Sequence, residues 1–536
     1  MNFFKLNKKL VLFFLFSLFA IFLHGSSQIP VLDRDEARFA SASKTMLEKE
    51  NFIDISIGEE KRYKKPIGIY WAQVLSNLSF GSYPYQDILI YRLPSIIGIF
   101  VSILLIYFFS IKNFDIRKAS LTVFFLIFSI LSISEMHQSK TDGMLFLFTN
   151  ICNLTLLELI KSKNSSKKLK YLFWLSLGLG AIIKGPIIFI FTLLPLLIFA
   201  LVCKRSFFKI FWSNLGILFF LIIVLTWFIV ITIKSGNNFW YESVYNDLLK
   251  KVGSGQESHG FPPGYYSALI FIFLWPCSIF VISFFIFLKK NWKNKTLRSD
   301  TNLFLFLWFI VPFLTFEIIF TKLPHYVFPS YTAICILIAN FLINQNFKNL
   351  KFITIPAIIY PLVLSLLFIY SIAEFSEFDQ ASILIICLFI FFIFSLVYFC
   401  VKKKIISLII FSGFFQLFFY LVLTNVLVSK LDSFWIANKV FKIIEENKNH
   451  SDEIYNYGFN EPSLYFMTSH ISKKINPLDI PPENLQNKIL LIITEEYSDI
   501  LSKNSRFREF EVISKFEGFN YSRGNKLIFK IYKNYQ

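Results

Sequence analysis

Long apolar runs separated by short polar intervals recur along most of the chain. Uncharged runs at 215–233 and 352–373 are as long as a helix that crosses a hydrocarbon layer about 30 Å thick. The pattern predicts a polytopic α-helical membrane protein with about thirteen transmembrane helices. They are expected at residues 10–24, 87–111, 119–134, 143–160, 170–183, 186–203, 209–233, 264–288, 302–320, 326–343, 351–373, 381–401 and 405–429.

Positive charge is concentrated in alternate loops, and this alternation sets the predicted orientation. Every second loop is rich in Lys and Arg. Together these loops hold about 24 of them and just two acidic residues, Asp115 and Asp300. Cytoplasmic loops of membrane proteins carry such an excess, so we expect a cytoplasmic N-terminus. An odd number of helices then places everything after residue 429 on the outer face. For a bacterial chain this predicts a multi-pass inner-membrane protein with periplasmic outer loops.

The composition excludes an ordinary soluble protein and argues against nucleic acid as a partner. Hydrophobic residues make up 55% of the 536 positions, and 17% of the residues are charged. The formal net charge of +19 is spread over short loops rather than along one face of a soluble domain. The six cysteines fall in or beside apolar runs without CxxC spacing, which indicates packing rather than disulfides or a thiolate metal site.

The chain changes character after residue 429. Short β-like runs at 453–457, 488–494, 510–515 and 526–532 follow a helical pattern at 433–446. A segment of about 100 residues is long enough to bury a core of its own. We therefore expect a transmembrane domain at 1–429 and a small soluble α/β domain at 430–536, called the C-terminal domain below.

The first outer loop, residues 24–86, carries acidic residues near its start and basic residues near its end. Asp33 and Glu36 have the spacing of a capping box that begins a helix running to about Glu48. On spacing alone, these carboxylates could serve just to cap that helix. Asp35 is not needed for the box and is the better candidate for chemistry. The basic cluster comprises Arg62, Lys64 and Lys65.

A second helix is predicted to begin at Pro66 and to lie in the membrane interface. Lys64 and Lys65 then precede its N-terminus, where backbone amides and the helix dipole already favour an anion. A phosphate at the depth of the lipid head groups is the natural ligand, and generic attraction to anionic lipid is the alternative. The apolar face expected to lie in the interface comprises Ile67, Tyr70, Trp71, Val74, Leu75 and Leu78.

Four other outer segments carry candidate site residues. Asp142 follows SKT in the second outer loop, and Lys184 stands at a helix break in AIIKGP. The segment 234–263 is long and Gly-rich, contains His259, and is typical of a flexible loop or lid. Lys322 and His325 flank a Pro-broken turn. Three lysines and a histidine on one membrane face favour a lipid-linked phosphate as the ligand.

Five motifs occur in order along residues 30–335, namely LDRDEARFA, RYKKPIGIYW, SKTDG, IIKGP and TKLPHYVFPSYTA. Together they resemble the polytopic GT-C glycosyltransferases of the aminoarabinose transferase (ArnT) and protein O-mannosyltransferase group. The thirteen-helix layout with an outer C-terminal domain is also similar to that group. The resemblance implies transfer of a sugar from a polyprenyl-phosphate donor to lipid A or another envelope acceptor, by an enzyme embedded among membrane lipids.

The resemblance also assigns expected roles to individual residues. Asp35 matches the acidic residue of the first outer loop in that group, with Glu36 beside it, and Asp142 matches a second acidic residue. Lys65 matches a ligand of the donor phosphate. The aminoarabinose transferases carry an acidic residue just before that lysine, paired with a histidine as a metal site. Lys64 occupies the acidic position here and His259 matches the histidine, so a divalent metal stays open.

The expected chemistry follows from the charge of the leaving group. A lipid phosphate departs with concentrated negative charge, which Lys65, Lys184 and Lys322 are placed to stabilise, with Lys64 as a further candidate. Asp35 acts as a general base towards a hydroxyl acceptor, or orients a phosphate acceptor. Arg62, His259 and His325 are candidates for acceptor or loop contacts.

Two other functions remain open from the sequence. A protein O-glycosyltransferase of the same architecture differs in its acceptor alone. A flippase for a lipid-linked sugar should carry polar residues at mid-membrane depth on broken helices. Most of the predicted helices are uncharged at their centres, which favours an enzyme.

Overall fold

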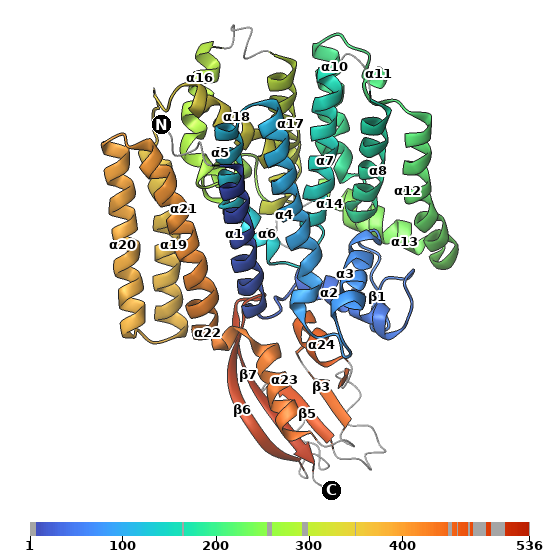
Figure 1. The fold of residues 1–536 in the computed structure, drawn as a ribbon. Coiled ribbons are helices and arrows are strands. Elements are labelled where there is room, and N and C mark those ends of the chain that lie inside the picture. Colours follow the sequence, from blue (N-terminus) through green and yellow to red (C-terminus); the bar gives the residue numbers. More distant parts are fainter. Residues whose placement is uncertain are drawn as a thin grey trace.

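A computed structural model describes residues 7–162, 166–253, 260–291, 299–348, 350–448, 453–457, 459–469, 472–474, 489–494 and 510–534. A layer of long helices lies on one side of the molecule and the C-terminal domain on the other (Figure 1). The N-terminal end of α1 and the C-terminal domain lie on opposite sides of that layer (Figure 1). This arrangement agrees with an odd number of membrane crossings.

The helical layer contains the predicted membrane spans. Within the described ranges, nine helices are long and apolar enough to cross a membrane, and two bent pairs bring the number to eleven. The helices of the layer are α1 (Lys8–Gln28), α4 (Ile88–Asn113), α5 (Ile116–Ile127), α6 (Ile130–Met136), α7 (Asp142–Lys161), α8 (Lys167–Lys184), α9 (Ile187–Phe191), α10 (Leu193–Val202), α11 (Phe207–Phe211), α12 (Asn214–Ser235), α15 (Tyr265–Phe273), η2 (Cys277–Phe280), α16 (Val281–Asn291), α17 (Asp300–Ile318), η3 (Pro324–Ser330), α18 (Tyr331–Asn344), α19 (Thr354–Phe375), α20 (Gln380–Val401), α21 (Ile405–Val422), η4 (Leu423–Leu427) and α22 (Val428–Lys430).

Each of the thirteen predicted segments is largely helical. Two of the thirteen are not among these eleven spans. Helix α8 carries lysines at both ends and is too charged, and the apolar pair α9–α10 is too short. The polytopic helical fold is therefore confirmed.

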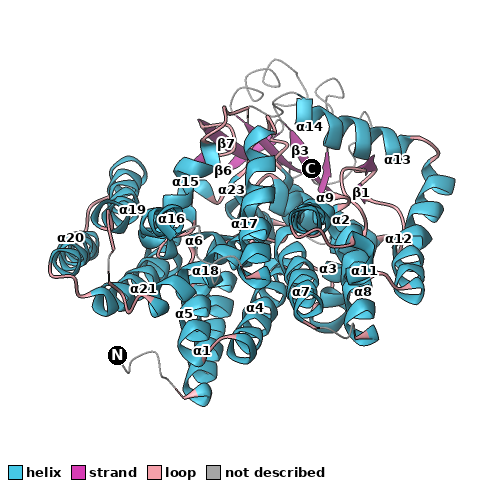
Figure 2. Ribbon diagram, turned by 90° about the horizontal axis from the view of Figure 1, so that it is seen from above, coloured by secondary structure: helices cyan, strands magenta, loops and turns pink. Residues whose placement is uncertain are grey.

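Burial separates helices that face the interior from helices that face lipid. The α7 and η3–α18 segments are almost wholly buried inside the helical layer, whereas α12 and α20 are mostly exposed. An exposed helix that is apolar all round requires an apolar solvent, so these surfaces fit a bilayer. Seen from above, α19–α21 form one end of the layer and α12 the other, with α7 and α18 between them (Figure 2).

Short elements cover the face of the layer next to the C-terminal domain (Figure 1). They are α2 (Asp35–Glu48), β1 (Ser56–Ile57), β2 (Glu60–Lys61), α3 (Gly68–Phe80), α13 (Asn238–Trp240), η1 (Tyr241–Leu249) and α14 (Lys250–Gly253). Residues 238–253 are helical. The prediction of a loop or lid at 234–263 is therefore wrong for most of that segment. His259 lies outside the described residues.

Two details of the first outer loop differ from the sequence prediction. The capping box does not form: α2 begins at Asp35, its N-cap is Arg34 at a φ of 68°, and no side chain caps it. The second helix begins at Gly68 rather than Pro66. Its predicted apolar face is also divided, because Tyr70 is buried in the core while Leu75 points outwards with 63% exposure. Packing against α2, α4 and α8 decides which apolar residues are covered.

The C-terminal domain is built on a five-stranded sheet in the order β4-β3-β5-β7-β6. Strand β3 pairs in parallel with β4 and β5, and β5, β7 and β6 pair antiparallel. The four predicted strands and the predicted helix are present, while β4 and α24 were not predicted. The elements are η5 (Asp432–Phe434), α23 (Ile436–Asn447), β3 (Glu453–Tyr457), α24 (Pro462–Thr468), β4 (Ser472–Lys474), β5 (Ile489–Thr494), β6 (Phe510–Asn520) and β7 (Asn525–Asn534).

Candidate active site

A cavity of about 960 Å³ lies where the short elements meet the helical layer. It is rimmed by the start of α2, the segment before α3, the break between α8 and α9, η1, and the turn before η3. Positive charge dominates this wall. Its described ionisable residues are Arg34, Arg38, Arg62, Lys64, Lys65, Lys140, Lys184, Lys251 and His325, together with Asp33, Asp35, Glu36, Asp142 and Asp247.

Two glycines bring the RYKKP and IIKGP motifs together. A methyl group at Gly68 would stand 2.7 Å from the carbonyl oxygen of Ile182, so the start of α3 contacts the end of α8 backbone to backbone. Gly185 adopts a φ of +67°, which ends α8 directly after Lys184. A methyl group added at Gly185 would stand 3.9 Å from Cγ of Pro66. These close approaches place Lys65 and Lys184 in the wall of one cavity.

Lys65 is held by a carboxylate that the sequence analysis missed. Its ammonium pairs with the carboxylate of Asp247, and the other oxygen of Asp247 lies 2.6 Å from Nζ of Lys251. Burial lowers the pKa of Lys65 to about 8, although Asp247 acts in the opposite direction. Burial acts to raise the pKa of Asp247, but Lys65 and Lys251 outweigh it and hold that pKa below its ordinary value. Two lysines and one carboxylate form a clamp that a phosphate oxygen can enter.

A second charged cluster lies deeper in the wall. Lys184 Nζ is 2.6 Å from the Asp142 carboxylate, and Lys140 Nζ is 3.0 Å from Glu135. His325 lies between the two pairs, with Nδ1 3.3 Å from Lys140 Nζ and Nε2 3.9 Å from Asp142. All five side chains are largely buried, where each charge depends on a neighbour of opposite sign. Asp142 therefore holds Lys184 in position at the cavity wall.

Asp35 faces the cavity as the first residue of α2. Its side chain is 49% exposed, and its Oδ1 lies 4.0 Å from the guanidinium of Arg38. The protein around the carboxylate acts to raise its pKa, but Lys140 and Arg62 outweigh that effect and hold the pKa below its ordinary value. Asp35 is therefore ionised at neutral pH and able to accept a hydrogen bond from a hydroxyl group in the cavity.

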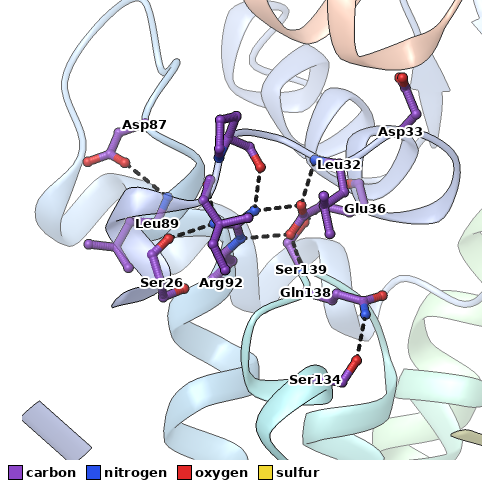
Figure 3. A network of polar contacts seen from close by, with 12 residues as sticks. Ser26, Leu32, Asp33, Glu36, Asp87, Leu89, Arg92, Ser134, Gln138 and Ser139 are labelled. Atoms are coloured by element: carbon purple, nitrogen blue, oxygen red, sulfur yellow. Dashed lines mark hydrogen bonds and ion pairs between the residues drawn. The ribbon is translucent and has the colours of Figure 1, made fainter. Parts of the chain in front are cut away.

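Unlike its neighbour, Glu36 lies inside a network of hydrogen bonds, which Figure 3 shows. Its two oxygens accept hydrogen bonds from the guanidinium of Arg92 at 2.8 and 2.7 Å. They also accept the backbone N–H groups of Leu32 and Ser139, each at 2.9 Å. The side chains of Glu36 and Arg92 are buried. These contacts give Glu36 the role of fixing the start of α2, and they favour that role over a catalytic one.

Arg92 uses all five of its N–H groups in this network. Besides Glu36, it donates to the carbonyl oxygens of Ser26, Ile29 and Pro30 at 2.6, 2.7 and 2.9 Å. The network therefore joins the end of α1, the start of α2 and the start of α4. The position of Asp35, one residue before Glu36, depends on it.

Several predicted residues have other positions. The Lys322 ammonium donates to the carbonyl oxygen of Ile319, and Lys322 is not among the described residues that line the cavity. The Asp33 carboxylate accepts the backbone N–H of Ser463 in the C-terminal domain at 3.1 Å. Arg62 and Lys64 line the cavity as expected. Within the described residues, no group of three His, Cys, Asp or Glu side chains is arranged to hold a metal ion.

The residues that the sequence analysis missed had weak signals or none. Asp247 and Lys251 stand four residues apart in NDLLKK, a spacing that pairs them on one helix face. Arg92 is an arginine inside an apolar run, which is costly in a membrane unless it is paired. Tyr521 and Ser522 also line the cavity, and nothing in the sequence connects them with residues almost 500 positions earlier.

The sequence is similar to several known proteins. The sequence profile of the family described as dolichyl-phosphate-mannose-protein mannosyltransferase matches residues 64–229. An undecaprenyl phosphate-alpha-4-amino-4-deoxy-L-arabinose arabinosyl transferase of Proteus mirabilis is 25% identical over 314 residues, which are 57% of this chain and 54% of that protein. An uncharacterized protein of Aquifex aeolicus is 26% identical over 338 residues, 62% of this chain and 74% of that protein.

The solved structure of ArnT from Cupriavidus metallidurans bound to undecaprenyl phosphate matches with a TM-score of 0.74 at 15% identity, over 98% of both chains. The chain therefore has the ArnT fold. The match covers 98% of the chain, so it includes the C-terminal domain as well as the helical layer. The sequence alignments with the arabinosyl transferases are shorter, and the chain spans about half the length of those relatives.

Proposed function

We propose that this ArnT-like chain transfers a sugar from a polyprenyl-phosphate donor to a lipid A-type acceptor or another envelope glycolipid. One observation carries the proposal: paired lysines and an ionised carboxylate converge in one cavity beside apolar side chains. Lys65, Lys184 and Lys251 supply the positive charge, and Asp35 supplies the carboxylate. The named activity of the arabinosyl transferase relatives supports the same reaction.

We assign the donor phosphate to the clamp formed by Lys65 and Lys251. The Asp247 carboxylate between them has the charge and the hydrogen-bonding atoms of a phosphate oxygen, so a phosphate can take its place without losing those interactions. Phe228, Trp240 and Leu248 line the same cavity and offer an apolar path for the prenyl tail. The ArnT of Cupriavidus metallidurans, whose structure was solved bound to undecaprenyl phosphate, supports that lipid as the ligand.

Transfer breaks the bond between the anomeric carbon and the phosphate oxygen, whose electron pair stays on the polyprenyl phosphate. The acceptor oxygen forms the new bond from the opposite side, so the anomeric configuration inverts. Lys65, Lys251 and Lys184 stabilise the negative charge that develops on the leaving phosphate. A hydroxyl acceptor gives its proton to Asp35, whereas a phosphate acceptor has no proton to give and is oriented by the surrounding charge.

We place this cavity on the periplasmic face of the inner membrane. The alternation of basic loops supports that orientation, with residues 1–429 in the membrane domain and 430–536 outside. The mechanism proposed assigns the stabilisation of charge to lysine side chains, Lys65 among them.

A protein O-glycosyltransferase is the second candidate. The family whose profile matches residues 64–229 is described as a protein mannosyltransferase, which favours this alternative. The two candidates share the donor clamp and differ in the acceptor. They are separated by finding which molecule loses a sugar when the gene is deleted.

Mass spectrometry of lipid A, envelope glycans and proteins from a deletion strain tests the proposal. We expect one envelope glycolipid to lose a sugar and to regain it when the wild-type chain is supplied. The variants Asp35→Asn and Lys65→Ala should be inserted normally yet fail to restore it. Lys112→Ala, at an exposed position on the far end of α4, should restore it and serves as the control. Loss of sugar from proteins would establish the second candidate, and no loss from any molecule would refute both.

A further inference from the structure

The C-terminal domain is joined to the active site by buried contacts. The buried Lys44 of α2 donates a hydrogen bond from Nζ to the carbonyl oxygen of Phe466 in α24 at 2.7 Å. Phe466 packs edge-on against Tyr91 of α4, with ring centroids 5.3 Å apart. Val31 and Ala37 belong to the same apolar cluster as Phe466. Because the contacts are buried, the domain holds a fixed place over α2.

Among the described residues of the C-terminal domain, those that line the cavity belong to one turn. The turn between β6 and β7, residues 521–524, contacts the loop that precedes Asp35. The backbone N–H of Asp33 donates to the Tyr521 hydroxyl at 2.7 Å, and the Arg34 guanidinium donates to the Ser522 carbonyl oxygen. Tyr521 and Ser522 line the same cavity as Asp35.

The turn is held in shape by its own hydrogen bonds. The backbone N–H and the hydroxyl of Ser522 both donate to Oδ1 of Asn520, at 3.1 and 2.8 Å. The amide of Asn520 and the guanidinium of Arg523 both contact Glu461, which stands directly before α24. A turn fixed at both ends presents its cavity side without an ordering cost when a ligand binds.

We propose that the β6–β7 turn forms the acceptor side of the active site and that Tyr521 and Ser522 contact the polar head of the acceptor. The cations assigned to the donor phosphate come from the segment before α3, from α8 and from α14, whereas the turn reaches the cavity beside the loop that leads into Asp35. The acceptor must approach Asp35, and this turn binds the two residues that precede it. The inference rests on the proposed transferase activity and adds the C-terminal domain to its substrate site.

The chemistry of the turn fits a hydroxyl-rich head group. The Tyr521 oxygen accepts the Asp33 N–H and still carries its own proton, which it can donate to an oxygen of a bound sugar. An aromatic ring also offers a flat apolar surface beside that hydroxyl. The acceptor class that matches is therefore a glycolipid head group rather than a bare phospholipid.

Photo-crosslinking in living cells tests the proposal without knowledge of the transferred sugar. Ser522 of the full chain is replaced by p-benzoylphenylalanine, and Val512, which is 51% exposed on β6 and does not line the described cavity, carries the same probe as the control. We expect irradiation to join position 522 to an envelope glycolipid, identified by mass spectrometry of the adduct, and to give no such adduct at 512. A protein adduct specific to 522, equal adducts at both positions, or phospholipid alone would overturn the proposal.

A kinetic measurement separates this proposal from the transferase assignment. With the glycolipid identified by the deletion strain as acceptor, Ser522→Trp should raise the acceptor KM at least about 10-fold, because the indole fills the acceptor side, while the Kd for undecaprenyl phosphate stays at the wild-type value. Val512→Trp should change neither. Unchanged acceptor KM in Ser522→Trp would refute the role of the turn, whereas donor binding unaffected by Lys65→Ala would count against the transferase site itself.

Discussion

The neighbouring carboxylates Asp35 and Glu36 should respond to loss of charge in opposite ways. In Glu36→Gln the amide group has the shape of the carboxylate but replaces one oxygen by an NH₂ donor. Each oxygen of Glu36 accepts two N–H groups, one from Arg92 and one from the backbone. Whichever way the amide points, its NH₂ therefore faces two donors. The buried guanidinium also loses its counter-charge.

The size of the effect follows from burial. Removing one partner of a buried ion pair costs about 3–5 kcal/mol, because the remaining charge is left without compensation. With an unfolding entropy of about 2.1 cal/mol/K per residue, this loss lowers the Tm of a cooperatively unfolding chain of 536 residues by about 3–4 °C. Asp35→Asn removes a half-exposed carboxylate and should leave Tm unchanged while abolishing transfer.

Thermal unfolding of the detergent-purified full chain measures the difference. Lys112→Ala is the matched control, because it breaks an ion pair with Glu158 at the other end of α4, where the Lys112 side chain is 69% exposed. An exposed pair contributes about 0–1 kcal/mol, so the control should shift Tm by less than about 1 °C. If Glu36→Gln lowers Tm no more than Lys112→Ala, the Glu36–Arg92 network does not hold α2 as we infer.

Further predictions concern the donor clamp and the packing that positions it. Lys65→Ala should weaken binding of undecaprenyl phosphate about 10- to 100-fold, as microscale thermophoresis would detect, since a hydrogen bond to a charged group contributes about 1.5–3 kcal/mol. Wild-type binding should decline as the pH rises through about 8, because Lys65 loses its proton there, and Asp247→Asn should move the decline to lower pH, because Asp247 raises the pKa of Lys65. A decline that stays at the same pH in Asp247→Asn would contradict this pairing. Gly68→Ala should lower Tm relative to Ser79→Ala on the exposed side of the same helix, because the added methyl meets Ile182. Lys322→Ala should bind undecaprenyl phosphate like the wild type, and a large loss would place Lys322 at the donor after all.

The pattern of apolar runs along the chain was sufficient to predict the membrane fold. Helix positions follow from apolar length, because an unpaired backbone group in lipid is so costly that an apolar run of this length must be helical. The breaks at Gly185 and Pro324 were visible for a similar reason, since glycine and proline leave the helical conformation at known cost. The strands of the C-terminal domain were also visible, although β4 is too short to give a pattern of its own.

The cavity itself could be predicted in part. Lys65, Lys184, Asp35 and His325 are polar groups at helix ends, and a membrane helix tolerates them there for a reason that sequence can show. Lys322 met the same criterion and does not line the cavity among the described residues. The direction of a side chain at a turn depends on backbone angles and neighbours, which a motif does not specify.

The sequence by itself determined the helical membrane architecture, the outer location expected for the polar loops, and the residue types of the proposed phosphate site. Tertiary structure decided which charges meet: Asp247 with Lys65, Glu36 with Arg92, and Tyr521 with the loop before Asp35. The physical reason is the range of the interactions. Burial in lipid acts on each segment separately and leaves a periodic trace, whereas a hydrogen bond between residues 488 positions apart exists only after both elements have packed.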